Sequence, residues 1–263
     1  MRITALVENQ SNGNLKGIHG LSLYIETPSH KILFDLGPDQ TLFDNSKIQG
    51  IDLTAVDTVV ISHGHSDHGG ALRQFLEINH TAKIYVQKEA FQKYYAKILL
   101  LKVDIGLDAE LMNHPQIVLV EGDFDIDDEL RLFTVTNAAK CYSSANDILY
   151  AEEGKDTFLH EQNLMIFGED NILVMGCGHV GVVNIMEKAA QYQPKVCVGG
   201  YHLFDPIAKK TVSDELLEEI ARELSAYDVH YYTCHCTGKS AFRYLSERIR
   251  DMSYFSCGDS IEV

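Results

Sequence analysis

The sequence has few basic residues and no long apolar stretch. Its 263 residues include 22 Lys and Arg against 38 Asp and Glu, giving a formal net charge of -16. A surface of this sign repels a phosphate backbone, so we expect no nucleic-acid partner, although an acidic surplus also serves simply to keep a protein soluble. No stretch approaches 18 uninterrupted apolar residues, and segment 1–10 has no basic region followed by an apolar one. We therefore expect neither a membrane span nor secretion.

Cysteine is also sparse. A secreted disulfide framework is short and dense in cysteine, whereas the six cysteines here are scattered along a long chain. They are Cys141, Cys177, Cys197, Cys234, Cys236 and Cys257. We therefore expect reduced thiols and a cytoplasmic location. The sequence leaves the oligomeric state open, a homo-oligomer included.

The chain has no internal repeat, no low-complexity segment and no Pro-, Gly- or Ser-rich linker. Its hydrophobic content of 45% is enough for a substantial core at this length. Strand-like runs punctuated by turn residues fill the first sixty residues, and strands alternate with helices in the last hundred. Both halves contain both kinds of element, so we expect one α/β sandwich domain over residues 1–263.

The region between these halves is less clearly patterned. We expect a helix over residues 89–99, strands over 116–121 and 130–136, and a polar loop over about 138–160. A loop of that length inside a compact domain is usually functional or mobile. Further along, Ser213 followed by Asp214 predicts the start of a helix over 213–226.

The segment 58–70, TVVISHGHSDHGG, is the most informative part of the chain. A strand runs into a loop that gathers His63, His65, Asp67 and His68. A chance cluster of histidines at the mouth of a buried strand would be costly without a partner, and a divalent cation supplies that partner. Imidazoles suit zinc, iron, manganese or nickel, and the carboxylate neutralises charge. In an extended segment the first two histidines share a face, so the aspartate and last histidine can face a second ion.

The pattern HGHSDH after a hydrophobic strand resembles the signature of the metallo-β-lactamase superfamily. Further segments resemble one branch of it, the group named after 7,8-dihydropterin-6-methyl-4-(β-D-ribofuranosyl)aminobenzene-5'-phosphate synthase. These segments are 7–10, 20–27, 32–39, 50–72, 174–186, 198–203 and 234–245. The resemblance implies a four-layer αββα sandwich with one or two divalent metal ions at an open edge. Zinc is the first expectation, with iron, manganese or magnesium as alternatives.

The resemblance also assigns roles to individual residues. It implies that His63 and His65 bind a first ion, that Asp67 and His68 bind a second, and that a buried aspartate supports the loop. The full set of expected metal ligands is His63, His65, Asp67, His68, His179 and His235, with Asp35 as the supporting aspartate and with Asp67 and His202 in catalytic roles. We expect Asp67 to orient the nucleophile or accept its proton, and His202 to act as a pocket-facing acid or base near the metals without binding them.

Two positions depart from the superfamily pattern. The usual bridging aspartate is absent from segment 176–179, where Cys177 stands in its place, either as a ligand or as a core residue. His160 is the only candidate for the histidine expected before it, and is otherwise a polar loop residue. If the strand over 229–235 persists, alternation prevents Cys234 and Cys236 from sharing the face of His235.

The resemblance implies a metal-dependent hydrolase or transferase that acts on a phosphorylated or ester-like small molecule through a metal-activated nucleophile. The alternatives are a transferase like the synthase that names the branch, an iron-dependent redox protein, and a metal-binding module without turnover. Lys239, at the start of an expected helix, is a candidate for holding an anionic group of the substrate. His19 lies in a loop that we expect to overhang the site.

Overall fold

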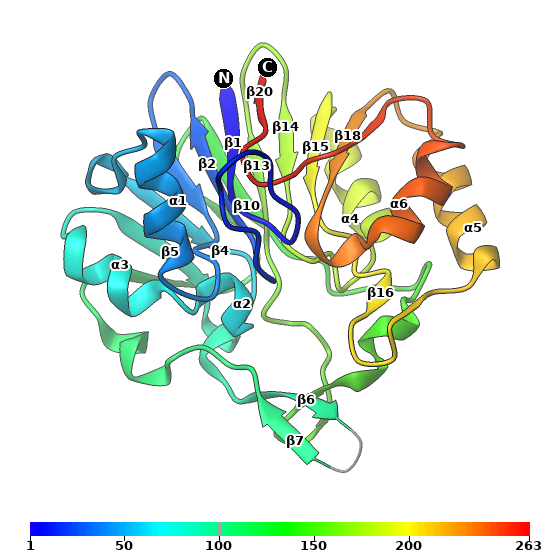
Figure 1. Cartoon of the computed structure of the whole chain (residues 1–263), viewed down its shortest axis with the longest axis horizontal. Helices are drawn as coiled ribbons and strands as arrows, with labels where there is room; N and C mark the ends of the chain where they lie inside the picture. The colour runs from blue at the N-terminus through cyan, green and yellow to red at the C-terminus, as the bar shows by residue number, and fades with distance from the viewer. Residues whose placement is uncertain (99–100) are drawn as a thin grey trace.

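Two seven-stranded sheets lie face to face in the computed structural model, which describes residues 1–98 and 101–263 (Figure 1). The first sheet has the order β20 (Ser260–Glu262), β1 (Arg2–Val7), β2 (Ser22–Glu26), β3 (Lys31–Phe34), β4 (Thr58–Ile61), β5 (Lys83–Gln87) and β8 (Ile117–Val120). The second has the order β19 (Met252–Tyr254), β18 (His230–Thr233), β15 (Val196–Gly199), β14 (Ile172–Val174), β13 (Asn163–Ile166), β10 (Leu130–Phe133) and β9 (Phe124–Asp125).

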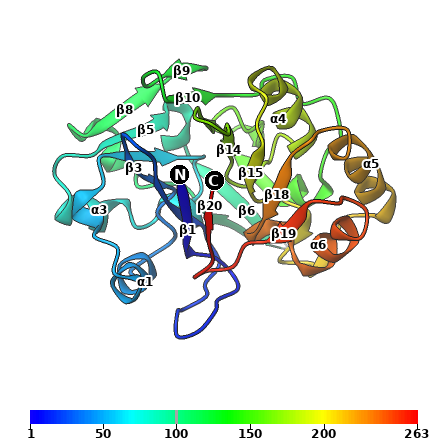
Figure 2. The ribbon, with the colours of Figure 1, turned by 90° about the horizontal axis from the view of Figure 1, so that it is seen from above.

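Helices cover the outer face of each sheet, as Figure 2 shows from above. The first sheet is flanked by α1 (Thr41–Gln49), α2 (Ser66–Gly69) and α3 (Leu72–Ile78), and the second by α4 (Val182–Ala189), α5 (Asp214–Leu224) and α6 (Lys239–Ser246). Short 3-10 helices are η1 (Leu53–Ala55), η2 (Lys88–Phe91), η3 (Ala109–Asn113), η4 (Ser144–Ile148), η5 (Ala190–Tyr192) and η6 (His235–Thr237). The architecture is therefore the expected four-layer αββα sandwich.

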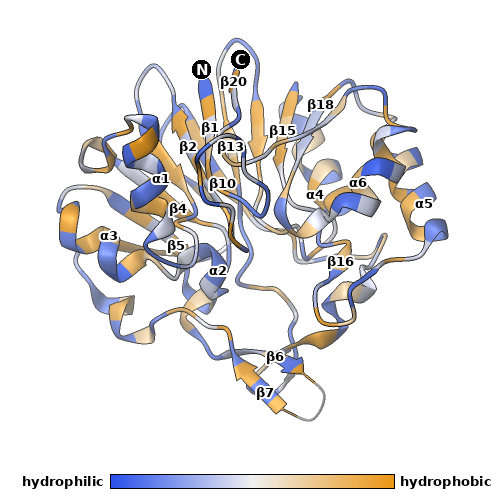
Figure 3. Ribbon diagram, viewed as in Figure 1, coloured by the Kyte–Doolittle hydropathy of each residue, from blue (hydrophilic) through white to orange (hydrophobic). Residues whose placement is uncertain are grey.

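Three apolar clusters hold the four layers together. Neighbouring residues of a strand face opposite sides, so Val59 packs under the helices of the first sheet while Val60 packs between the sheets. In the second sheet, Leu173 packs under the helices and Val174 packs between the sheets. Figure 3 shows the result as apolar strands at the centre and more polar helix surfaces outside. Strands buried on both faces explain the nearly continuous apolar runs in the sequence.

A small sheet stands apart from the sandwich, in the order β12 (Gly154–Lys155), β11 (Leu149–Ala151), β6 (Tyr94–Ile98) and β7 (Leu101–Asp104). The prediction of a helix over 89–99 is wrong here, because η2 and β6 occupy residues 88–91 and 94–98; residue 99 lies outside the described residues. The expected loop over 138–160 contains η4, β11 and β12. A two-stranded ribbon, β16 (Phe204–Asp205) and β17 (Lys210–Thr211), lies near this sheet in Figure 1.

The directions of the strands bring the HGHSDH segment and the segments 176–179 and 234–236 to the same edge of the sandwich. β3, β4, β5 and β8 run parallel to one another, as do β14, β15, β18 and β19. The carboxyl ends of parallel strands are where α/β folds place their sites. Strands are present within the predicted segments 58–64 and 229–235, where β4 ends at Ile61 and β18 at Thr233. The predicted helix after Ser213 is α5, which begins at Asp214, and the Ser213 hydroxyl accepts from Leu216 N at 3.3 Å. Among the helices within the described ranges, none is long and apolar enough to cross a membrane.

Candidate metal centre

The expected donor residues converge from both sheets. β3 ends before Asp35, β4 before the HGHSDH loop, β14 before the GCGH turn, β15 before His202 and β18 before the turn that carries His235. Gly176 permits the close approach, because a Cβ there would clash with Ser62 Oγ. The HGHSDH loop therefore lies beside both turns of the second half, as predicted.

The first donor group consists of His63, His65 and His179. All three are buried, and their candidate ligand atoms lie within 4.8 Å of one another. The Nε2 atoms of His63 and His179 are 3.3 Å apart. His65 Nε2 is buried and has no hydrogen-bond partner in the part of the chain that the structure describes. A group of three imidazoles is a known donor set for zinc.

The second donor group consists of Asp67, His68 and His235. His68 Nε2 lies 3.2 Å from His235 Nε2, and Asp67 Oδ2 lies 3.3 Å from His235 Nε2 and 3.7 Å from His68 Nε2. Two nitrogen ligands of one tetrahedral zinc ion are separated by about 3.3 Å, given zinc–nitrogen bonds of about 2.0 Å. The spacing in both groups thus suits donors that share an ion.

Hydrogen bonds fix which ring nitrogen of each histidine is free to bind. Ser62 Oγ donates to Asp35 Oδ2 at 2.8 Å, so His63 Nδ1 must donate to Ser62 Oγ at 2.7 Å. His68 Nδ1 donates to Asp35 Oδ2 at 2.7 Å. Asp35, Ser62 and the loop therefore form one network that leaves the Nε2 atoms of His63 and His68 facing the site. Asp35 takes the supporting position that the resemblance implies.

His179 and His235 are each held by an asparagine and a glutamate. Asn146 Oδ1 accepts from His179 Nδ1 at 2.9 Å, and Asn9 Oδ1 accepts from His235 Nδ1 at 2.9 Å. Glu161 Oε1 accepts from His179 N at 2.7 Å, and Glu8 Oε1 accepts from His235 N at 2.6 Å. None of these four supporting residues was predicted from the sequence. Glu8 and Asn9 lie in a segment that carries the family resemblance, and Glu161 follows His160, but no motif marks Asn146.

The facing nitrogens fit a bound cation. With each Nδ1 acting as a donor, the Nε2 lone pairs of His63 and His179 point at each other, which is unfavourable without a proton or cation between them. Burial, reinforced by neighbouring imidazoles, holds the pKa of both rings well below its usual value. Both rings are therefore neutral at neutral pH, and no proton lies between their Nε2 atoms. These residues therefore fit a divalent metal ion.

The second donor group differs from the first in that two carboxylates, Asp67 and Asp35, contact its histidines. Burial opposes the charge on Asp67, but His68, His19 and His235 outweigh it and hold the pKa of this carboxyl well below its usual range. Burial also opposes the charge on His68, yet Asp35 and Asp67 raise its pKa to about 9. The two carboxylates thus favour a positive charge at this position, whether a proton or a metal ion. His19, in the loop expected to overhang the site, reaches Asp67 Oδ2 at 3.2 Å.

Cys177 lies between the two donor groups. Its Sγ is 3.2 Å from His68 Nε2, and its sulfur belongs to a set with His63 and His68 whose ligand atoms lie within 4.8 Å of one another. Burial raises the pKa of the Cys177 thiol well above its usual value. Burial also opposes the charge on the neighbouring Cys236, but its hydrogen bond with Cys177 and the nearby His235 outweigh burial and lower the pKa of that thiol. Cys177 is thus placed to contact donors of both groups.

The strand does not persist through residue 235, so the alternation expected for a continued strand does not apply: β18 ends at Thr233 and the chain turns into η6. His235 adopts a left-handed backbone conformation with φ 51°. As a result His235 and Cys236 both line the cavity described below, and Cys234 packs between the sheets. Asp35 and His202 are also left-handed, with φ 62° and 46°, and such strain is typical of functional sites.

His160 supports the loop instead of facing the metal positions. Its Nδ1 accepts from Gly64 N at 2.9 Å, so its Nε2 donates to Asp156 Oδ2 at 3.0 Å. Both ring nitrogens of His160 are therefore engaged in hydrogen bonds with the protein. Burial opposes the charge on Asp156, but the contacts with His160 and His65 hold the pKa of this carboxyl well below its usual value. The bond to Gly64 connects the 138–160 region to the HGHSDH loop.

A cavity of about 340 Å³ opens onto both donor groups. His202 lines it, with its ring centroid 4.2 Å from that of His179. The ring of His202 is 8% exposed, and neither of its nitrogens has a hydrogen-bond partner among residues 1–98 and 101–263. An unpartnered buried imidazole is costly in the absence of a ligand, so its position suits contact with a bound molecule.

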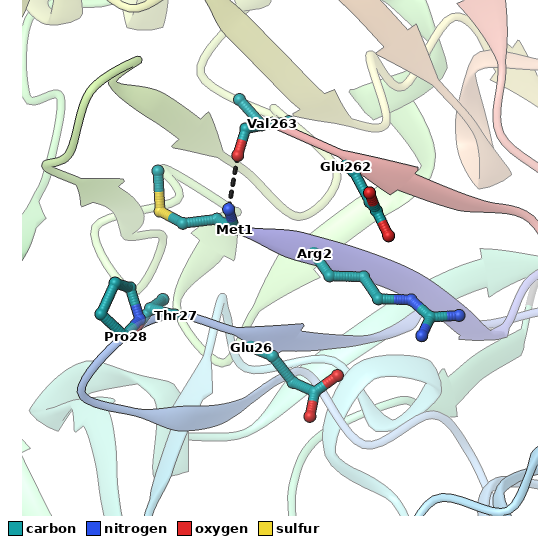
Figure 4. A pocket seen from close by; sticks show the side chains of 7 residues that line it. All are labelled: Met1, Arg2, Glu26, Thr27, Pro28, Glu262 and Val263. Carbon is teal, nitrogen blue, oxygen red and sulfur yellow. Dashed lines mark hydrogen bonds between the residues drawn. The ribbon is translucent and has the colours of Figure 1, made fainter.

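Two further recesses bear on the site. Lys239 lies in a smaller cavity of about 240 Å³ that shares Asn9, Phe204 and His235 with the cavity above. An open recess of about 590 Å³ lies where the first and last strands begin and end, at Met1 and Val263 (Figure 4). Its lining contains neither histidine nor cysteine, and the Met1 amino group donates to the Val263 carbonyl oxygen. This recess offers none of the donors found at the site.

Known proteins resemble this chain in sequence. A family model described as the metallo-beta-lactamase superfamily matches residues 15–140. In Methanocaldococcus jannaschii, the uncharacterized protein MJ0448 is 28% identical over 250 residues, covering 93% of this chain and 94% of that protein. The 7,8-dihydropterin-6-methyl-4-(beta-D-ribofuranosyl)-aminobenzene-5'-phosphate synthase of the same organism is 27% identical over 260 residues, covering 89% of this chain and 85% of the synthase.

Solved structures share the whole architecture. Tm1679, described as a metal-dependent hydrolase of the beta-lactamase superfamily, matches with a TM-score of 0.85 and 27% identity over 100% of this chain and 99% of its own. YhfI from Bacillus subtilis, a metallo-beta-lactamase fold protein, matches with a TM-score of 0.57 and 11% identity over 99% of each chain. The chain therefore has the metallo-beta-lactamase fold. Its residues 15–140 resemble the metallo-beta-lactamase superfamily in sequence as well.

Proposed function

We propose that this protein is a metal-dependent hydrolase that cleaves a phosphorylated or ester-like small molecule. The observation that carries the proposal is the pair of donor groups, His63, His65 and His179 beside Asp67, His68 and His235, which open onto one cavity. We further propose that these groups hold two divalent ions, with zinc as the first expectation for their imidazoles. Such ions lower the pKa of a water molecule and polarise a substrate oxygen.

Two side chains would move the protons of the reaction. In hydrolysis a water oxygen bonds to the acyl carbon or phosphorus while the bond to the leaving oxygen breaks. Asp67, which is ionised at neutral pH, would accept a proton from the attacking water. His202 would donate a proton to the leaving oxygen, since its ring lines the cavity with both nitrogens free of partners in the described chain. The products are an acid and an alcohol.

Group transfer is the second candidate, supported by the 27% identity with the M. jannaschii synthase over most of both chains. In that case a substrate nucleophile would take the place of water, and His202 would have the same task at the leaving group. The two candidates differ in whether turnover requires an acceptor molecule, which a product analysis with and without acceptors distinguishes.

The location of the protein, its class of substrate and its domain organisation are also part of the proposal. None of the six cysteines, all of which lie in the described ranges, forms a disulfide, which supports a reducing, cytoplasmic location. The net charge of -16 supports a small-molecule substrate over a nucleic acid. We propose that residues 1–263 act as one domain, because the donor groups draw residues from both sheets.

The proposal is tested by metal analysis together with an activity panel. Protein purified without added metal is expected to contain one or two divalent ions and to hydrolyse at least one of a phosphodiester, a thioester and a lactam. The double variant His63→Ala, His65→Ala should lose metal and activity but keep much of its fold, because the sandwich has its own core. His80→Ala, which removes an exposed histidine outside the site, is the matched control. Stoichiometric metal in the double variant would rule out the assigned site.

A further inference from the structure

The wall of the cavity that faces the donor groups is apolar. It is formed by Ala96 and Ile98 from β6, Ile105 after β7, and Ile148 and Leu149 where η4 meets β11. Ile207, between β16 and β17, adds to it. A ligand that reaches the metal centre must therefore lie with one side against aliphatic side chains, which favour an apolar group.

The lysine side chains of the small sheet lie on the side of the sheet that faces away from the cavity. Alternation along β6 places Ala96 and Ile98 on the cavity side and Lys97 on the opposite side. The amino groups of Lys97, Lys102 and Lys155 instead lie over the ring of Tyr150, at 5.7, 5.5 and 4.6 Å from its centroid. Across the described residues, the cavity lining contains neither Lys nor Arg. An anionic group would meet no cationic side chain against this wall.

The apolar face of the hairpin also extends beyond the cavity. Leu101 pairs with Ile98, and Val103 pairs with Ala96, so all four share one face. Leu101 and Val103 are 71% and 43% exposed, whereas most other aliphatic residues of the strands are buried. The face that lines the cavity is thus only partly covered by the protein itself, and a bound apolar group would reduce its exposure to water.

From these observations we propose that the substrate is an uncharged ester-like molecule whose apolar acyl or aryl group lies against the β6–β7 hairpin. This inference rests on the proposed hydrolase function and narrows its substrate class. The competing class, a phosphorylated substrate, would place its charge near Lys239, which lies in the smaller neighbouring cavity and does not line this one.

The first experiment measures kcat/KM of the metal-loaded protein for 4-nitrophenyl hexanoate, 4-nitrophenyl acetate and 4-nitrophenyl phosphate. We expect the hexanoate ester to be preferred. The double variant Ile105→Ala, Ile148→Ala should lower kcat/KM for hexanoate about tenfold more than for acetate. Ile48→Ala, which removes an exposed isoleucine from α1, is the matched control and should change neither value. Equal losses for both carboxylic esters would place the shared aryl group against the wall. Preference for the phosphate ester, or no loss for either carboxylic ester, would overturn the proposed substrate class.

The second experiment separates binding from turnover. Calorimetry on the metal-loaded protein compares butyrophenone, which is neutral and apolar, with inorganic phosphate, which is anionic and has no apolar group. We expect the double isoleucine variant to weaken butyrophenone binding about tenfold and to leave phosphate binding unchanged. If this holds while no ester is hydrolysed, the hydrolase proposal fails and the apolar ligand class stands. If butyrophenone binds no more weakly to the variant, the ligand class fails whatever the activity.

Discussion

Asn9 and Asn146 hold two different histidines of the metal centre by the same pair of hydrogen bonds. Asn146 Nδ2 donates to the His179 carbonyl oxygen at 2.9 Å while its Oδ1 accepts from the ring of the same residue. Asn9 Nδ2 donates to the His235 carbonyl oxygen at 3.3 Å, and its Oδ1 accepts from that ring. In each case the side-chain amide bonds to both the ring and the backbone of the same histidine, which fixes the direction of Nε2.

Removing either amide should weaken metal binding without unfolding the protein. We expect Asn146→Ala to lower metal affinity by about 10- to 100-fold, because His179 would lose the partner that sets its tautomer and orientation. Competition with a coloured chelator measures this affinity. Asn79→Ala is the matched control, since Asn79 is also buried and bonded to backbone carbonyls but lies away from the centre. Equal affinities in the two variants would contradict the orienting role.

Asp67→Asn should affect turnover far more than stability. The substitution keeps the shape of the side chain but removes the charge that we assign to proton transfer, so the rate should fall by about 100-fold or more. Melting temperatures measured with Asp228→Asn as an exposed control should change little. An unchanged rate on any active substrate would exclude the proposed role of Asp67.

Cobalt substitution tests whether Cys177 binds a metal ion. With Sγ 3.2 Å from His68 Nε2, we expect the cobalt-loaded protein to show a thiolate-to-metal absorption band in the near ultraviolet. Cys177→Ala should abolish this band, and Cys197→Ala, at a buried cysteine of β15, should keep it. A band that survives in Cys177→Ala would identify Cys236 as the sulfur ligand instead.

His30 should make stability depend on pH. Its Nδ1 lies 3.1 Å from Asp57 Oδ1 and its Nε2 lies 2.8 Å from Asp127 Oδ2. Burial opposes the charge, but these carboxylates outweigh it and raise the pKa of His30. A raised folded-state pKa gives stabilisation that is complete below the unfolded value and is lost as pH rises through the folded one.

We therefore expect His30→Gln to lower the free energy of unfolding by on the order of 1 kcal/mol at about pH 5.5, and by less at about pH 9. Urea titrations of both proteins at the two pH values measure this difference. A difference that grows with pH would show that the ring contributes as a neutral group.

The donors of the HGHSDH segment could be predicted because the sequence gathers them locally, whereas His179 and His235 are identified only through the family resemblance. The HGHSDH segment follows an apolar strand directly, and its donors are neighbours before the chain folds. Asn9 and Asn146 could not be found in this way, because each reaches its histidine only after the two sheets have packed together. Single polar residues at such distances carry no periodic signal.

The differences between expectation and structure also arise from contacts that form only in the folded chain. Segment 89–99 is rich in residues that favour helices, but pairing with β7 and β11 overrides that preference from residue 94 onwards. The alternation argument for Cys234 and Cys236 assumed that a strand continues, whereas Glu8 accepts from His235 N and the chain turns there. Both outcomes depend on partners that are distant in the sequence.

The small sheet of β6, β7, β11 and β12 contributes Ala96, Ile98 and Leu149 to the apolar wall of the cavity but, in the described chain, none of the six donors of the two groups. The sheet is nevertheless tied to the donor loop, because the carbonyl oxygen of Ile105, directly after β7, accepts from Ser66 N at 2.7 Å. Exchange of the whole hairpin would therefore disturb the donors as well. Single substitutions on the apolar face of β6 are the route to a new selectivity that leaves this backbone bond in place.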